Sequence, residues 1–141
     1  MHKFFYISAW AGILSAILMV LVLGFWMVYP YQVLKFNIAP SAISQDSYKR
    51  GTPITYIADY CKYVDVPAEI TVQFIDGIVF TLPAHAGSFT DVGCGKKVVQ
   101  LIIPATLPAG EYKISVTHKY QLNPIRSATI ISETNKFFVT E

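Results

Sequence analysis

The feature that most constrains this chain is an apolar run near its N-terminus, residues 4–30, that carries no charged side chain. A helix rises 1.5 Å per residue, so about 20 apolar residues cross a hydrocarbon core of roughly 30 Å. The run is therefore long enough to span a bilayer with some tilt. We expect a transmembrane signal anchor over residues 1–30 and one separate domain over residues 31–141.

Charges and aromatic residues beside the run predict its orientation. Lys3 precedes the run and the next charged residue is Lys35 beyond it, so the slight basic bias favours an inside N-terminus. Trp26, Tyr29 and Tyr31 gather at the other end, as aromatic rings do at the headgroup level. We expect a single-pass protein of a bacterial inner membrane, held in the lipid bilayer, with a cytoplasmic N-terminus and a periplasmic C-terminal domain.

A cleaved signal peptide is the competing interpretation of the same run, because a basic start followed by an apolar stretch is also its signature. Two features favour a retained anchor. The apolar part of a signal peptide is normally only about 7 to 15 residues long, and no small-x-small site directly follows this run. The sequence alone does not decide between them.

Beyond the run the pattern changes from continuously apolar to alternating, which predicts β-strands. We expect about seven strands, over residues 32–38, 52–63, 69–75, 78–82, 97–103, 107–121 and 128–139. Asp76-Gly77 is the strongest hairpin signal, and Asn123-Pro124 marks another turn. Residues 83–95 are expected to form a loop. This spacing predicts an all-β domain in which two antiparallel sheets pack as a sandwich.

The segment Leu107 to Tyr112, LPAGEY, resembles the turn before the penultimate strand of immunoglobulin-like and fibronectin-like domains, where a tyrosine hydroxyl closes the corner. The resemblance implies an immunoglobulin-like antiparallel β-sandwich over residues 31–141. The antibody pattern itself is absent, since this part contains no Trp and Cys94 lies upstream of Tyr112 instead of two residues after it. We therefore expect no antibody-type disulfide between the sheets.

The layout of the whole chain carries a second resemblance. A short basic start, one apolar run and a small β-domain with the segments DYCKY, GCG and NPIR resemble uncharacterised small membrane proteins of tailed bacteriophages. That resemblance implies a role at the host envelope, such as superinfection exclusion or the modulation of lysis or entry.

Two cysteines, Cys61 and Cys94, fall in the part expected outside the membrane, where an oxidising periplasm permits disulfides. We expect them to pair, which would stabilise the domain by roughly 3 to 4 kcal/mol by restricting the unfolded chain. The alternative is a reactive thiolate or metal ligand. It needs an activating His or basic partner that the sequence cannot place.

Charge and motifs argue against nucleic-acid binding and against catalysis. The formal net charge is +2 and the basic residues are scattered, whereas a nucleic-acid surface needs a concentrated basic face. Neither a Gly-x-Ser-x-Gly elbow nor a phosphate-binding glycine loop is present. We expect no enzyme activity, no cofactor and no nucleic-acid partner.

A copper site of the cupredoxin kind enters consideration because His85 and His118 accompany the two cysteines. Cupredoxins share a late Cys followed closely by His and Met, whereas all three Met here lie at position 1 or inside the apolar run. His118 falls on the apolar side of its strand, which predicts a buried histidine instead. We expect no bound metal.

Two groups of residues are candidates for binding a protein partner. Small residues at multiples of four in the apolar run define a helix face that a second helix can approach closely, although small residues are also common in single spans. They are Ser8, Gly12, Ala16 and Gly24. In the outer domain, an aromatic and charged strip is expected to be exposed for recognition. It consists of Asp59, Tyr60, Lys62 and Tyr63.

The leading hypothesis is a non-enzymatic single-pass membrane protein that presents a β-sandwich in the periplasm to bind another protein. The alternative is an accessory subunit of a multi-subunit membrane complex, docked through its transmembrane helix. A homo-oligomer formed through the helix uses the same small residues. The sequence does not identify the partner.

Overall fold

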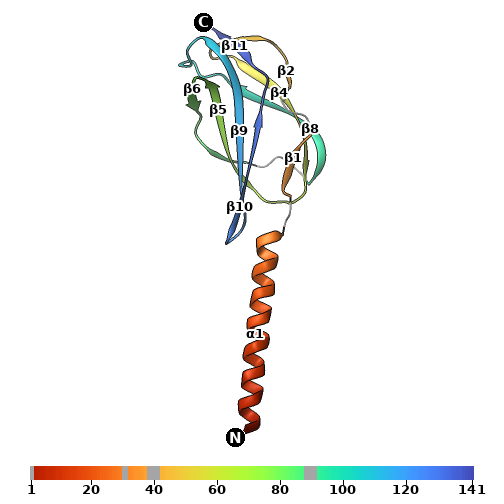
Figure 1. The fold of residues 1–141 in the computed structure, drawn as a ribbon. Coiled ribbons are helices and arrows are strands. Elements are labelled where there is room, and N and C mark those ends of the chain that lie inside the picture. Colours follow the sequence, from red (N-terminus) through yellow and green to blue (C-terminus); the bar gives the residue numbers. More distant parts are fainter. Residues whose placement is uncertain (1, 30–31, 38–41, 88–91) are drawn as a thin grey trace.

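A computed structural model describes residues 2–29, 32–37, 42–87 and 92–141. Within these ranges, one helix, α1 (His2–Val28), precedes eleven β-strands. Figure 1 shows the helix projecting from the β-domain, with the C-terminus at the opposite end of that domain. The segment Trp10–Val28 is long and apolar enough to cross a membrane, and none of it is buried by the rest of the chain. A signal sequence near the N-terminus has the same properties.

The strands form two sheets. The first contains β1 (Leu34–Phe36), β2 (Ala42–Ile43), β4 (Pro53–Lys62) and β8 (Gly93–Ile102). β8 pairs with β4 along its whole length, so β1 and β2 share the other edge of β4. All pairings in this sheet are antiparallel. β8 therefore forms the outer edge of the sheet on its side of β4.

The second sheet is built around β9, which is its longest strand. It contains β3 (Ser47–Lys49), β5 (Ala68–Asp76), β6 (Ile78–Thr81), β7 (His85–Gly87), β9 (Gly110–Asn123), β10 (Arg126–Glu133) and β11 (Phe137–Thr140). β5 pairs along one edge of β9, while β10 and β11 share the other edge. β6 and β7 extend the sheet beyond β5, and β3 joins β11 in a parallel pair.

The two sheets enclose a single apolar core. Alternation along β4 turns its even-numbered residues inward, where Ile54, Tyr56 and Ala58 are buried. Phe74 of β5 and Ile114 of β9 meet them from the second sheet and are fully buried. The all-β class with one N-terminal apolar helix is thus confirmed. The immunoglobulin-like topology is a finer statement and stays a prediction.

The expected strand over residues 128–139 is wrong, because the chain breaks into β10 and β11. Thr134 lies at the break and is 5% exposed. Its side chain takes part in the hydrogen bonding that main-chain groups alone provide in a regular strand. Its Oγ1 accepts a hydrogen bond from the main-chain nitrogen of Ile114 at 3.0 Å, and its own nitrogen donates to Ile114 at 2.9 Å. The chain can then return to the start of β9, where Phe137 pairs with Tyr112.

Two stretches expected to be irregular contain strands. The loop expected over residues 83–95 holds β7 and the first residues of β8, so Cys94 lies in a strand. The segment between the strands expected over residues 32–38 and 52–63 holds β2 and β3. These strands are only two or three residues long, apart from β8, so they are too short to produce a period-two pattern of their own.

The turn between β9 and β10 reaches the C-terminal end of α1. Asn123 Nδ2 donates a hydrogen bond to the main-chain oxygen of Trp26, and Arg126 Nη1 donates one to that of Val28, both at 2.7 Å. Carbonyls in the last turn of a helix lack partners within the helix. The hairpin supplies those partners, and Figure 1 shows its tip beside the upper end of the helix.

Candidate functional site

Cys61 and Cys94 form a disulfide with an S–S distance of 2.02 Å, which confirms their pairing. The two residues lie directly opposite each other in the β4–β8 pair. The bridge therefore stays within the first sheet and does not join the sheets as in antibody domains. It also means that neither sulfur is available as a thiolate nucleophile or as a metal ligand.

The strip predicted to be exposed is largely buried. Tyr60 is 6% exposed and Lys62 is 1% exposed, so the predicted exposure of these two residues is wrong. Both are even-numbered residues of β4, so they lie on its inward face with Ile54, Tyr56 and Ala58. Strand β1 pairs with this end of β4 at the edge of the same sheet.

The other two members of the strip remain at the surface. Tyr63, just after β4, is 49% exposed. The Asp59 side chain is 19% exposed; its carboxylate accepts a hydrogen bond from Asn37 Nδ2 at 2.7 Å and lies 3.9 Å from the Lys96 ammonium. Of the strip, Tyr63 alone offers a large exposed side chain, and its binding to a partner stays a prediction.

The outward face of the first sheet carries exposed aliphatic side chains that the sequence analysis did not single out. Ile57 and Val98 are cross-strand partners, with 46% and 65% of their surfaces exposed. Further along the same face, Pro53 is the partner of Ile102, which is 67% exposed. We call these four residues the outer patch. Scattered apolar residues are normal on a surface, whereas a large contiguous apolar patch marks an interaction site; here the polar Thr55–Gln100 pair lies between the two apolar pairs.

The outer patch borders an open sheet edge. Within the described part of the chain, β8 pairs with β4 alone, so the main-chain groups on its far edge face no other strand. Such an edge is a template for an added strand from a partner. Lys96, which is 70% exposed on this strand, limits indiscriminate pairing because a charge on an edge strand disfavours aggregation.

The small-residue face of α1 is open. A methyl group added at Gly12 or Gly24 would meet no atom within 4 Å, and Ala16 is exposed. Ser8 lies within the helix, and its side chain is outside the described part of the structure. No described part of this chain therefore covers the face at Gly12, Ala16 or Gly24. Its predicted use by a partner helix remains a prediction.

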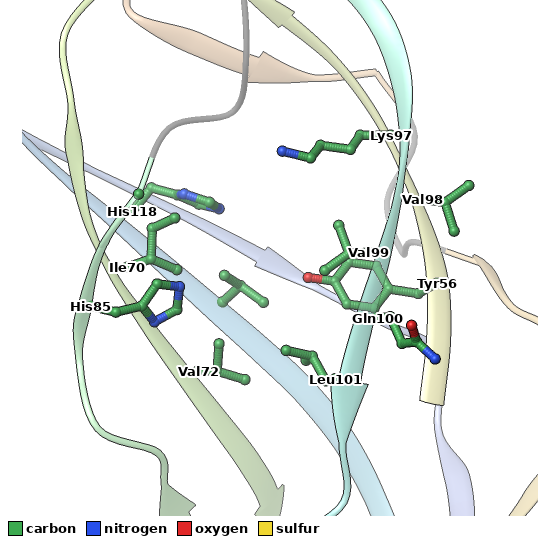
Figure 2. Close-up of a pocket in the computed structure, with 12 residues that line it drawn as sticks. Tyr56, Ile70, Val72, His85, Lys97, Val98, Val99, Gln100, Leu101 and His118 are labelled. Carbon is green, nitrogen blue, oxygen red and sulfur yellow. The ribbon is translucent and has the colours of Figure 1, made fainter. Parts of the chain in front are cut away.

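His85 and His118 line a cavity of about 320 Å³ between the two sheets (Figure 2). His118 is 1% exposed, and burial lowers its pKa to about 4, so the ring is uncharged at neutral pH. Two aromatic rings lie near it, with the ring centroids of Phe36 and Tyr120 at 5.7 and 6.5 Å from that of His118. The described residues contain no group of three or more His, Cys, Asp or Glu that could hold a metal ion.

Lys97 is the cavity residue that the sequence analysis overlooked. It alternates with Val99 and Leu101 on β8, so all three occupy the inward face of the strand. A charge among inward aliphatic residues is a detectable signal, because lysine is rarely placed towards a core.

Comparisons with known proteins identify no relative by sequence. No protein-family model matches the chain, and no curated protein matches it. Solved structures give distant likenesses. The sporulation control protein Spo0M from Bacillus subtilis aligns with a TM-score of 0.47 and 13% identity, over 78% of this chain. The chain spans half the length of that protein.

Two further solved structures show similar or weaker likeness. A Niemann-Pick type C2 protein from the Japanese carpenter ant aligns with a TM-score of 0.47 and 12% identity, over 77% of this chain and all of that one. The Pseudomonas fluorescens alkylpurine DNA glycosylase AlkC aligns with a TM-score of 0.36 and 14% identity, over 77% of this chain and 30% of that one. Likenesses of this size carry no functional inference.

Proposed function

We propose that this chain is a non-enzymatic, single-pass membrane protein of a bacterial inner membrane that presents an immunoglobulin-like β-sandwich in the periplasm to bind another protein. The observation that carries the proposal is the outer patch at the open edge of β8. If the protein is phage-encoded, as the sequence resemblance implies, the partner belongs to the host envelope. The binding surface lies on the first sheet, centred on Ile57 and Val98.

Several features support the membrane anchor. The Trp10–Val28 segment exposes every side chain, which suits a lipid environment. At the end of the helix, Trp26 and Tyr29 provide the amphipathic rings found at membrane interfaces. Ile125, at the tip of the hairpin that holds this end, is 55% exposed and lies where an apolar side chain can enter the headgroup region.

The disulfide supports the periplasmic side. Disulfides persist in oxidising compartments such as the bacterial periplasm and are rare in the cytosol. The pairing of Cys61 and Cys94 therefore agrees with the orientation that Lys3 favours at the N-terminus. The shared core of two sheets and the burial of Tyr112 after the Gly110 turn support an immunoglobulin-like sandwich.

The chemistry of the outer patch supports a protein partner. Interface centres are depleted in charge and rich in well-packed apolar groups, with polar groups at the rim. Ile57 and Val98 provide such a centre, and the Asp59–Lys96 ion pair lies two residues further along both strands, on the same face. An added partner strand on β8 would pair its main chain and cover Val98 at the same time.

The test is site-specific crosslinking of the full-length protein in native membranes. A photoreactive amino acid replaces Val98, or Ile131 of β10, which is equally exposed at 61% on the other sheet. We expect a specific adduct from position 98 and none from position 131. Val98→Asp should abolish co-purification of the crosslinked protein, whereas Ile131→Asp should not.

A third photoreactive position, Gly12, separates the accessory-subunit alternative from the proposal. Adducts from position 12 that persist in the Val98→Asp variant would establish docking through the helix and contradict the proposal. Absence of any adduct at position 98, in a protein that retains its disulfide, would contradict it as well.

A further inference from the structure

The tip of the β9–β10 hairpin lies at the level of the last turn of α1 (Figure 1). Asn123 Nδ2 and Arg126 Nη1 donate hydrogen bonds to the main-chain oxygens of Trp26 and Val28, both at 2.7 Å. These two oxygens belong to the end of the Trp10–Val28 segment, which is long and apolar enough to cross a membrane. In a bilayer spanned by that segment, the tip lies where the helix leaves the hydrocarbon core.

The tip presents apolar side chains outward. Ile125 is 55% exposed, and Pro124 beside it is exposed as well. Residues 121–127 include no acidic side chain, so the tip carries no charge that anionic lipid headgroups would repel. Transfer of Ile125 from water to the boundary between headgroups and acyl chains removes apolar surface from water, which is favourable.

Several polar main-chain groups of the tip are paired within the hairpin. The nitrogen of Ile125 donates a hydrogen bond to Asn123 Oδ1 at 3.1 Å, and Pro124 has no N–H group. Gln121 Nε2 donates to the main-chain oxygens of Asn123 and Arg126, at 2.5 and 3.4 Å. An unpaired main-chain group is costly where water is scarce. These contacts therefore reduce the cost of placing the tip in lipid.

Asn123 links the tip to the helix through both ends of one side-chain amide. Its nitrogen donates to the Trp26 oxygen, and its oxygen accepts from the Ile125 nitrogen. Carbonyls in the last turn of a helix have no partner within the helix, so the contact also satisfies a group of α1. The depth of Ile125 is therefore tied to that of Trp26.

We propose that the β9–β10 tip inserts into the headgroup region of the bilayer that α1 spans, with Ile125 at the boundary with the acyl chains. The inference rests on the proposed membrane anchor and deepens it, because it gives the β-domain a lipid contact of its own. A lipid partner is favoured over a protein partner because two hydrogen bonds hold the tip at a depth where lipid surrounds α1. A second contact besides the helix restricts the tilt of the domain relative to the membrane.

The test is fluorescence quenching of a single tryptophan in the full-length protein, reconstituted in vesicles of phosphatidylcholine and phosphatidylglycerol. Trp10→Phe and Trp26→Phe remove both native tryptophans, and Ile125→Trp introduces the reporter. We expect strong quenching by phosphatidylcholine brominated near the carboxyl end of its acyl chains, and weaker quenching by lipid brominated near the methyl end. Iodide on both sides of the membrane should quench this tryptophan only weakly.

Ile131→Trp in the same background is the matched control. Ile131 is 61% exposed on β10 and lies further along the chain, roughly 20 Å from Ile125 in an extended strand. We expect iodide to quench position 131 several-fold more strongly than position 125, and brominated lipid to leave it unquenched. Disulfide formation and thermal melting establish that each variant is folded.

Trp26, retained in a Trp10→Phe variant, separates failure of this inference from failure of the anchor. Quenching of Trp26 by brominated lipid, together with equal iodide quenching of positions 125 and 131, would overturn the inference and leave the anchor intact. Shielding of position 125 from iodide without quenching by brominated lipid would overturn it too, because protein would then cover the tip. If brominated lipid quenches none of the three tryptophans, the proposed anchor fails together with the inference.

Gln121→Ala tests the pairing of the main chain at the tip. In the Ile125→Trp protein it removes the donor to the oxygens of Asn123 and Arg126, so brominated lipid should quench position 125 less. Gln100→Ala, at an exposed position of β8, should leave that quenching unchanged. Equal quenching in these two variants would overturn the role given to Gln121.

Discussion

Arg126 donates a hydrogen bond from Nη1 to the main-chain oxygen of Val28 at 2.7 Å, and so ties the β9–β10 turn to the last residue of α1. The helix has no basic residue of its own in its last turn. A cation at a helix C-terminus interacts favourably with the helix dipole, and Arg126 supplies it from 98 residues further along the chain. Together with the hydrogen bond from Asn123 to Trp26, this contact holds the orientation of the β-domain relative to the helix.

Arg126→Ala should loosen this junction. We expect the domain to lose about 1 kcal/mol of stability and the end of the helix to become more accessible. Trp26 reports on it directly: in a Trp10→Phe background, its fluorescence should be quenched more strongly by iodide in the variant. Arg50→Ala is the control, since Arg50 pairs with Glu141 away from the helix. Equal quenching in the two variants would argue against the junction.

Thr134 makes a testable contribution at the break between β10 and β11. Its Oγ1 accepts a hydrogen bond from the buried nitrogen of Ile114 at 3.0 Å. Thr134→Val keeps the shape and leaves that nitrogen without its acceptor, so we expect a loss of about 1 to 3 kcal/mol. Thr134→Ser retains the hydroxyl and should lose much less. Urea denaturation of both variants measures the difference, and equal stabilities would disprove the role of the hydroxyl.

Acid should destabilise the fold through His118. Burial holds its pKa near 4, compared with 6.5 for an exposed histidine, because the charged ring would lose its hydration. The unfolded chain therefore binds a proton below about pH 6.5, and the folded chain does so only below about pH 4. The contribution of neutral His118 to the free energy of unfolding is fully present above pH 6.5 and falls as the pH drops through this window. At the lower end of the window the free energy of unfolding is reduced by about 3 kcal/mol.

The pH dependence can be assigned to this residue by substitution. Between pH 7.5 and 5, the free energy of unfolding of the wild type should drop by about 2 kcal/mol from this source. His118→Gln should lack that component, whereas His85→Gln, at an exposed position of β7, should retain it. An identical pH dependence in all three proteins would show that His118 is not its cause.

Removal of the disulfide should cost the domain much of its stability. Cys61 and Cys94 are 33 residues apart, and cross-linking a loop of that length stabilises by roughly 3 to 4 kcal/mol in the chain-entropy model. The Cys61→Ala, Cys94→Ala double variant should therefore melt more than about 10 °C lower. Comparison with the reduced wild type controls for the lost side-chain packing. An unchanged melting temperature in both would mean that the bridge does not stabilise the domain.

Much of the fold could be predicted because β4, β5 and β9 are long enough to show their alternation. In β9, Tyr112, Ile114 and Val116 are buried at every second position, as the sequence indicates. The break at Thr134 could not be predicted, because a hydrogen bond to Ile114, 20 residues upstream, determines it. No local pattern of residues carries that information.

The candidate sites were harder to predict than the strands. The aromatic and charged side chains of Tyr60 and Lys62 indicate a recognition strip, whereas the alternation of β4 places both on its inward face. The outer patch depends on which residues of β4 and β8 face each other, and this pairing is set by the whole sheet. Lys97 is different, since its place between inward aliphatic residues is visible in the sequence itself.

The disulfide has a consequence beyond stability. Successive residues of a strand point to opposite faces, so sliding β8 along β4 by a single position would exchange its two sets of side chains. Lys97 and Val99 would then face solvent, while Lys96 and Val98 would turn towards the cavity. The bond between Cys61 and Cys94 permits only the register in which Lys97 and Val99 face inward. Oxidation of two sulfurs at one end of the strand thereby selects which side chains of β8 face the cavity further along it.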